Sequence, residues 1–192
     1  MYEYIEGSLI EKNPTCCTIE TGGIGYFIQI TLTTFSGMGT GTRVRLYLHQ
    51  VVREDAHLLF GFHTKQEREM FRQLLTVSGI GANTARMMLS SLTSEDVRQA
   101  ILSGNVSLLQ SIKGIGAKTA QRVILDLRDK VTKDKTGELF PVKDNRLKDE
   151  ALSALVILGF NKGEADKVIN KILLAEKSLA LEDLIKKALK EL

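Results

Sequence analysis

Two short glycine turns, 35 residues apart, are the segments of this sequence best suited to bind a ligand. The segment SGIGANTA at residues 78–85 recurs as KGIGAKTA at residues 113–120, and a hydrophobic pattern of helical period follows each copy. The first amides of a helix have no partner inside it, and the helix dipole favours an anion at that end. Each turn could therefore hold a phosphate through its backbone, which predicts a protein that binds nucleic acid without reading its bases.

The two glycines of each turn have different expected roles. Gly79 and Gly114 can adopt a positive φ angle, which closes the turn. Gly81 and Gly116 lack a Cβ atom, so a phosphate group can approach the backbone closely. The turns therefore combine a tight bend with exposed amide donors.

Cationic side chains accompany the second turn more clearly than the first. Lys118 stands where an ammonium group could join the amides, and Arg122 lies one turn further along the same helix. In the first copy Asn83 occupies the position of Lys118 and offers an uncharged donor, for which Arg86 could partly compensate. The expected DNA-binding residues are Gly79, Ile80, Gly81, Asn83, Thr84, Arg86, Gly114, Ile115, Gly116, Lys118, Thr119 and Arg122.

Three alternative roles for the glycine turns fit the sequence less well. Glycine is common in simple connections between helices, but two copies in one register favour a shared binding role. A nucleotide-binding P-loop needs glycine directly before its lysine, whereas Ala117 precedes Lys118 and residues 110–112 supply no upstream glycine. The same segment lacks the third glycine of a dinucleotide-binding fingerprint.

Composition and charge agree with a DNA-binding protein. The chain has 192 residues, 43% hydrophobic and 26% charged, which is enough to bury the cores of several small domains. Its formal charge is −2 over residues 1–63, +4 over 64–131 and +1 over 132–192, so the positive excess coincides with the repeat. No apolar run is long enough for a membrane span, and we expect a cytoplasmic protein. Cys16 and Cys17 suit a strand better than a zinc site, and neither metal nor cofactor is expected.

Residues 1–63 are predicted to form a small β-barrel. Residues typical of strands are concentrated in five segments, at 2–10, 16–20, 25–32, 43–52 and 56–62, with turn residues between them. Five short strands in this length favour a closed barrel over an open sheet. Such barrels can stack bases on aromatic side chains, but we interpret six aromatic residues of this part mainly as core: Tyr26, Phe27, Phe35, Tyr47, Phe60 and Phe62.

The rest of the chain is predicted to be helical, in two parts separated by a linker. Residues 64–131 place helices on both sides of each turn, one capped by Ser94 and another running from 117 to about 130. Residues 132–146 are polar and without a period, which predicts a flexible linker. Residues 147–192 show three apolar stripes, typical of a three-helix bundle with an exposed patch for a partner protein at Leu158, Gly159 and Phe160.

Over essentially its whole length the sequence resembles the RuvA family, which binds Holliday junctions in bacteria. Besides both glycine turns, the resemblance is carried by IEK at 10–12, GGIGY at 22–26, VVREDA at 51–56, LFGF at 59–62 and KQER at 65–68. It implies a multi-domain fold, β then α: an OB-type barrel, a tandem helix-hairpin-helix domain and a small UBA-like three-helix domain. It also implies a non-catalytic homotetramer, or two tetramers face to face, that holds a four-way DNA junction open. The implied protein partners are the hexameric RuvB ATPase, which drives branch migration, and the RuvC resolvase, in recombination, DNA repair and the SOS response.

The resemblance also assigns a role to an acidic pair. Glu54 and Asp55 fall on the family's acidic pin, where two carboxylates near converging phosphates repel them and help guide the strands apart. From the residues alone, the pair is an exposed hairpin turn. Two features depart from the family: Asn83 replaces an expected lysine, and Glu3 and Glu6 stand where basic residues are frequent. The barrel is therefore expected to attract phosphate less strongly here.

Two other functions stay open at this point. An enzyme built on the same hairpins, such as a glycosylase or a structure-specific nuclease, would need an added lysine or aspartate, or clustered carboxylates. Asp126 and Asp129 follow the second turn, but they also suit a solvent-facing helix surface. Residues 147–192 also fit a pure protein-interaction module, because their charge is nearly balanced and their apolar stripes could leave a groove.

Overall fold

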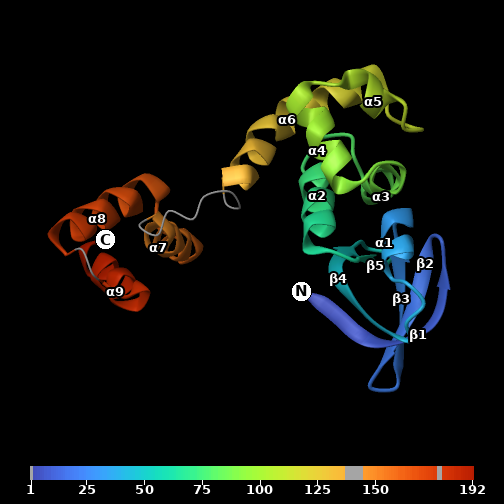
Figure 1. The fold of residues 1–192 in the computed structure, drawn as a ribbon, viewed down its shortest axis with the longest axis horizontal. Helices are drawn as coiled ribbons and strands as arrows, with labels where there is room; N and C mark the ends of the chain where they lie inside the picture. Colours follow the sequence, from blue (N-terminus) through green and yellow to red (C-terminus); the bar gives the residue numbers. More distant parts are fainter. Residues whose placement is uncertain (1, 137–144, 177–178) are drawn as a thin grey trace. The chain divides into compact units, whose positions relative to one another are not determined.

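The computed structural model describes residues 2–136, 145–176 and 179–192. The chain divides into two compact units, Met1–Gly137 and Glu138–Leu192, which are described separately below (Figure 1). None of the helices in the described ranges is both long and apolar enough to cross a lipid bilayer.

The first unit begins with a closed five-stranded barrel, as the sequence predicts. Its strands are β1 (Tyr4–Asn13), β2 (Cys16–Thr21), β3 (Ile24–Ile30), β4 (Arg43–Val52) and β5 (His57–Phe62), in the order β1-β2-β3-β5-β4. All neighbouring strands are antiparallel except β3 and β5, which are parallel. The side chain of Asn13 accepts hydrogen bonds from the amides of Thr15 and Cys16, both at 3.0 Å, and so fixes the turn between β1 and β2.

Two local predictions for the barrel are wrong. Leu32 does not continue a strand but begins a short helix, α1 (Leu32–Gly37), because the Thr31 hydroxyl caps it by accepting from the Thr34 amide at 2.9 Å. Phe27 is not part of the core, since 63% of its surface is exposed. Its neighbour Ile28 takes the inward position of β3, and alternation along the strand turns Phe27 outward.

The helical part of the first unit packs directly on the barrel. It comprises α2 (Lys65–Leu75), α3 (Ala82–Ser91), α4 (Ser94–Ser103), α5 (Val106–Gln110) and α6 (Ala117–Thr136). Helix α2 lies between the barrel and the other helices, and its Phe71 ring contacts Phe60 and Phe62 of β5, with centroids 5.2 and 4.8 Å apart (Figure 1). One continuous core therefore holds the glycine turns and the barrel in a fixed relation.

Two helix boundaries differ from the prediction. Helix α4 is capped by Thr93 rather than Ser94, because Thr93 and Asp96 form a reciprocal capping box. Helix α6 continues to Thr136, past its expected end near Lys130, with Val131 fully buried in the core. Residues 132–136 of the predicted linker are thus helical, α7 begins at Asn145, and residues 137–144 lie outside the described residues.

A buried acidic residue of α2 joins this helix to α1. The carboxylate of Glu67 accepts hydrogen bonds from the hydroxyls of Thr31 and Thr34, the second at 2.8 Å. Next to it, the buried Arg68 donates to the carbonyl and the carboxylate of Glu3 at 2.8 and 2.6 Å. Burial raises the pKa of Glu67, and the two threonine hydrogen bonds oppose that rise.

The variant Glu67→Gln tests this burial through the pH dependence of stability. Because its pKa is higher in the folded state, Glu67 favours folding below its unfolded pKa of 4.5, and this contribution is lost as pH rises through the folded pKa. Between pH 4.5 and about pH 7.5, the free energy of unfolding should therefore fall in the wild type relative to E67Q. Urea unfolding at both pH values measures this change, and parallel pH curves for the two proteins would contradict it.

The second unit is a bundle of three helices, as predicted. They are α7 (Asn145–Ile157), α8 (Lys162–Ala175) and α9 (Leu181–Glu191), around a core that includes Leu155, Ile169 and Leu184. Phe160 packs against this core, whereas Leu158 is 58% exposed and its neighbour Ile157 is 83% exposed. The apolar patch predicted near Leu158 is therefore at the surface, and its use by a partner stays a prediction.

Candidate nucleic-acid interface

The two glycine turns share one backbone geometry. Gly79 and Gly114 both have φ = +91°, which explains why glycine is needed there. In both copies the residue between the glycines donates its amide three residues back, Ile80 to Val77 at 3.1 Å and Ile115 to Ile112 at 3.0 Å. The sequence repeat is thus a structural repeat.

The second glycine of each turn is not required by the protein's own geometry. Gly81 has an ordinary extended φ of −92°, and Gly116 is likewise outside the positive-φ region. A Cβ atom added at either position would meet nothing within 4 Å beyond its chain neighbours. Glycine at these two positions therefore leaves space on the outside, where a ligand can reach the backbone.

The helices that follow the turns also lack a capping side chain. In the first unit, α1, α2, α4 and α5 begin with a threonine or asparagine whose oxygen accepts from a first-turn amide. Helix α3 follows Gly81 and has no such hydrogen bond, and Gly116 before α6 has no side chain to supply one. The amides that begin α3 and α6 are consequently the ones available to an external anion.

The structure divides the predicted site residues by how they could contact a ligand. Ile80 and Ile115 are only 5% exposed and anchor the turns in the core, so only their backbone can face DNA. Asn83 and Lys118 are exposed at equivalent positions beside their turns. Thr84 and Thr119, one residue further on, are half-buried.

The two arginines near the turns make different contacts. Arg86 donates to the carbonyl of Thr15 at 3.2 Å and so connects α3 to the turn between β1 and β2. Its help to the first turn, where Asn83 is uncharged, stays a prediction. Arg122 donates to the carbonyl of Ser78 at 3.3 Å, so a side chain of the second copy reaches the first turn. Sequence reasoning missed this contact, because no spacing along the chain signals it.

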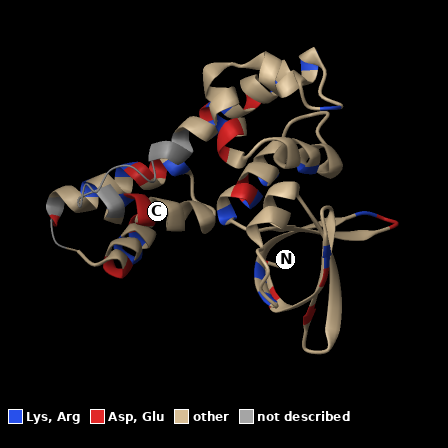
Figure 2. Cartoon of the chain, turned by 45° about the vertical axis from the view of Figure 1, so that its right-hand side comes forward, with Lys and Arg blue, Asp and Glu red and all other residues tan. Residues whose placement is uncertain are grey.

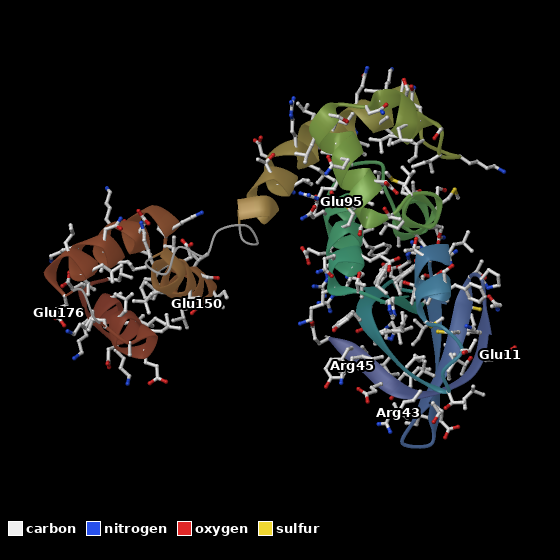
Figure 3. The ribbon with its side chains drawn as sticks, viewed as in Figure 1. Glu11, Arg43, Arg45, Glu95, Glu150 and Glu176 are labelled. Atoms are coloured by element: carbon white, nitrogen blue, oxygen red, sulfur yellow. The ribbon has the colours of Figure 1, made fainter. Side chains whose placement is uncertain are left out.

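Glu3, directly before β1, and Glu6, within β1, stand where the family frequently has basic residues, and both pair with arginines. Glu6 accepts from Arg45 at 2.8 Å and lies 3.3 Å from Arg43, and these two arginines project from β4 (Figure 3). Glu3 is paired with Arg68. The neighbouring arginines hold the pKa of Glu6 below its ordinary value, and Arg68 does the same for Glu3. Glu6 therefore offsets Arg43 and Arg45 of β4, and Glu3 offsets Arg68 of α2.

Glu54 and Asp55 lie in the hairpin turn between β4 and β5. Both are exposed, and the turn is closed by a hydrogen bond from the Arg53 amide to the Ala56 carbonyl at 2.8 Å. In the described part of the chain, positions with Lys or Arg and positions with Asp or Glu both occur along the ribbon of each unit (Figure 2). The features that distinguish the two glycine turns are the open amides of α3 and α6 and a few charges placed beside them.

Comparison with known proteins follows the same division of the chain. Residues 1–61 match the family model described as RuvA N terminal domain, 71–129 that of the SAM-like helix-hairpin-helix tandem, and 147–192 that of the RuvA C-terminal domain. A relative from Christiangramia forsetii is 54% identical, and one from Flavobacterium psychrophilum 47% identical, each over 100% of both chains. Both relatives are named Holliday junction branch migration complex subunit RuvA.

Proposed function

The chain belongs to the RuvA family, and from that premise we propose that it binds the four-way Holliday junction as a non-catalytic scaffold. In this proposal one tetramer, or two tetramers face to face, holds the junction open. The assembly recruits the RuvB ATPase in the cytoplasm. The RuvC resolvase is proposed as a further partner. The motor then moves the junction, and this chain binds the DNA and positions it.

One observation carries the proposal: two equivalent turns whose second glycines, Gly81 and Gly116, are required neither by a positive φ angle nor by a close contact within the protein. Each turn offers helix N-terminal amides to one phosphate, and such contacts are independent of base sequence. A junction has no fixed sequence as it migrates, so contacts to the backbone are the kind that can persist. Because one core joins the turns to the barrel, both turns keep a fixed position relative to the hairpin at Glu54 and Asp55.

Selection of a junction over a duplex requires more than the turns. A four-fold assembly would place pairs of turns along each of four duplex arms, and multivalent binding multiplies weak contacts. The carboxylates of Glu54 and Asp55 would meet at the centre and repel phosphates that cross it. A continuous duplex must cross that centre, whereas the arms of an open junction turn away from it.

Titration of a four-way junction and of a linear duplex with the same sequences tests this function. The protein should bind the junction more tightly, and its affinity should fall with salt by a log–log slope of roughly −0.9 per phosphate contact. Native mass of the protein with and without junction would give the number of copies. Equal affinity for junction and duplex would refute the proposal.

Neutralising the acidic hairpin should weaken this selection. With Glu54→Gln and Asp55→Asn together, duplex affinity should rise about three- to tenfold and junction affinity should rise less, because repulsion is removed mainly where a duplex crosses the centre. The matched control neutralises Glu11 and Glu20, two exposed carboxylates on other strands of the barrel. An equal gain in control and hairpin variants would show that net charge alone is responsible.

A further inference from the structure

We propose that Arg122, on the helix of the second turn, supplies the cationic phosphate contact of the first turn. This inference rests on the proposed DNA binding and refines it: it assigns one side chain to a turn other than its own. The observation behind it is the hydrogen bond from Nη1 of Arg122 to the carbonyl of Ser78, the residue directly before Gly79.

The geometry leaves the Arg122 guanidinium able to bind a phosphate. Arg122 is exposed, and its 3.3 Å contact with Ser78 engages Nη1. A guanidinium carries five N–H donors in a planar fork that matches phosphate oxygens, so further donors can turn to a ligand held at the first turn. The carbonyl of Ser78 thus holds the cation at the first turn, next to the residue that precedes Gly79.

A second contact shows that α6 follows the chain leading into the first turn. Lys130, two turns beyond Arg122 on α6, donates to the hydroxyl of Thr76 at 3.0 Å. Thr76 lies two residues before Ser78, so two cations of one helix reach the segment that precedes Gly79. The Arg122 contact is therefore part of how α6 packs along this segment.

Equivalent positions of the two turns differ in the number of cations they carry. The second turn has two lysines, Lys113 before its first glycine and Lys118 after its second. The equivalent positions of the first turn hold the uncharged Ser78 and Asn83. Met87 is the equivalent of Arg122 and carries no charge, so the first copy has no cation at the equivalent position to offer the second turn. With Arg122 counted at the first turn, both turns have a cation.

A double-mutant cycle between Arg122→Met and Asn83→Lys tests the assignment. Methionine is what the first copy carries at this position, so R122M removes the charge but keeps a flexible, helix-compatible side chain. R122M should weaken junction binding about tenfold and lower the salt slope by about one phosphate contact. Asn83→Lys should recover most of that loss in R122M, yet change the wild type less than about threefold, because Arg122 already serves the turn.

Three further variants separate this effect from general charge and from folding. Arg128→Met removes an exposed cation of α6 about 9 Å further along the helix, and its affinity should stay within about threefold of the wild type. When Asn83→Lys is added to the Lys118→Met variant, junction affinity should rise no more than it does in the wild type. The charge lost in Lys118→Met belongs to the second turn, which position 83 does not serve. Arg122→Lys keeps the charge but not the planar fork, so it should bind the junction more tightly than R122M, with a salt slope closer to that of the wild type, even if R122M folds poorly.

If Asn83→Lys raised junction affinity equally in the wild type, in R122M and in Lys118→Met, the assignment of Arg122 would be overturned. An unchanged salt slope in R122M would overturn it as well. The cycle is measured on linear duplex as well as on the junction. A wild type that binds both equally would refute the proposed junction preference, whereas the coupling between positions 83 and 122 would still be read on either DNA.

Discussion

Replacing Gly81 and Gly116 together by alanine is expected to weaken junction binding by about 100-fold or more, without loss of thermal stability. Each added methyl group occupies the open side of a turn, where nothing in the protein lies within 4 Å. A phosphate oxygen would then be kept from the amides that begin α3 and α6. A hydrogen bond to a charged group contributes about 1.5–3 kcal/mol, so one lost contact per turn suffices for this effect, and several copies multiply it.

Stability and affinity must be measured separately, because the neighbouring glycines respond differently. Gly79 and Gly114 have positive φ, so alanine there should lower the melting temperature and reduce binding indirectly. Alanine at Gly81 or Gly116 should leave the melting temperature unchanged or slightly raised, since their backbone angles suit any residue. Gly41→Ala, in the loop before β4, is the matched control and should alter neither quantity. If the double variant is stable and binds the junction normally, the turns are only connections between helices.

The sequence was sufficient to predict the parts of the fold that depend on local patterns. The five strands, the positive-φ glycines and the three-helix bundle follow from alternation, turn residues and helical stripes within short windows. The predictions that failed involve competition between neighbours in the chain. Thr93 and Ser94 both carry a cap hydroxyl, and only the reciprocal bond with Asp96 decides between them. Phe27 and Ile28 are both suited to a core, but neighbouring residues of a strand face opposite sides, so only Ile28 is buried.

Contacts between distant segments were beyond prediction from this one chain. Nothing in the spacing of Arg122 and Ser78 indicates that they meet, since their contact depends on how α6 packs against the first turn. The same holds for Glu6 with Arg45, which lie 39 positions apart and pair because β1 and β4 are adjacent in the barrel. The resemblance to the family led to the expectation that Glu6 weakens DNA attraction. The structure shows that Glu6 is the partner of a strand arginine, and its effect on DNA binding stays a prediction.

Removing everything after Thr136 is expected to abolish motor-driven branch migration while leaving junction affinity within about threefold of the wild type. The glycine turns and the acidic hairpin all belong to the first unit, and the second unit has its own core. Thr136 is a better end point than Val131, which the sequence suggested, because Val131 is fully buried in the core that supports the turns. Branch migration of a junction by the RuvB ATPase and ATP, with the full chain and the shortened chain compared, measures the effect.

A surface variant of the full chain makes the same test without truncation. Leu158→Ser changes an exposed residue of the second unit, so it should leave the bundle folded and junction affinity unchanged while reducing stimulation of the motor. Leu174→Ser is the matched control: Leu174 is 83% exposed and lies near the far end of α8, about 18 Å along that helix from its start. Loss of stimulation with both leucines would indicate a wider contact surface than the patch at Leu158. Full migration by the chain that ends at Thr136 would show that the motor docks on the first unit instead.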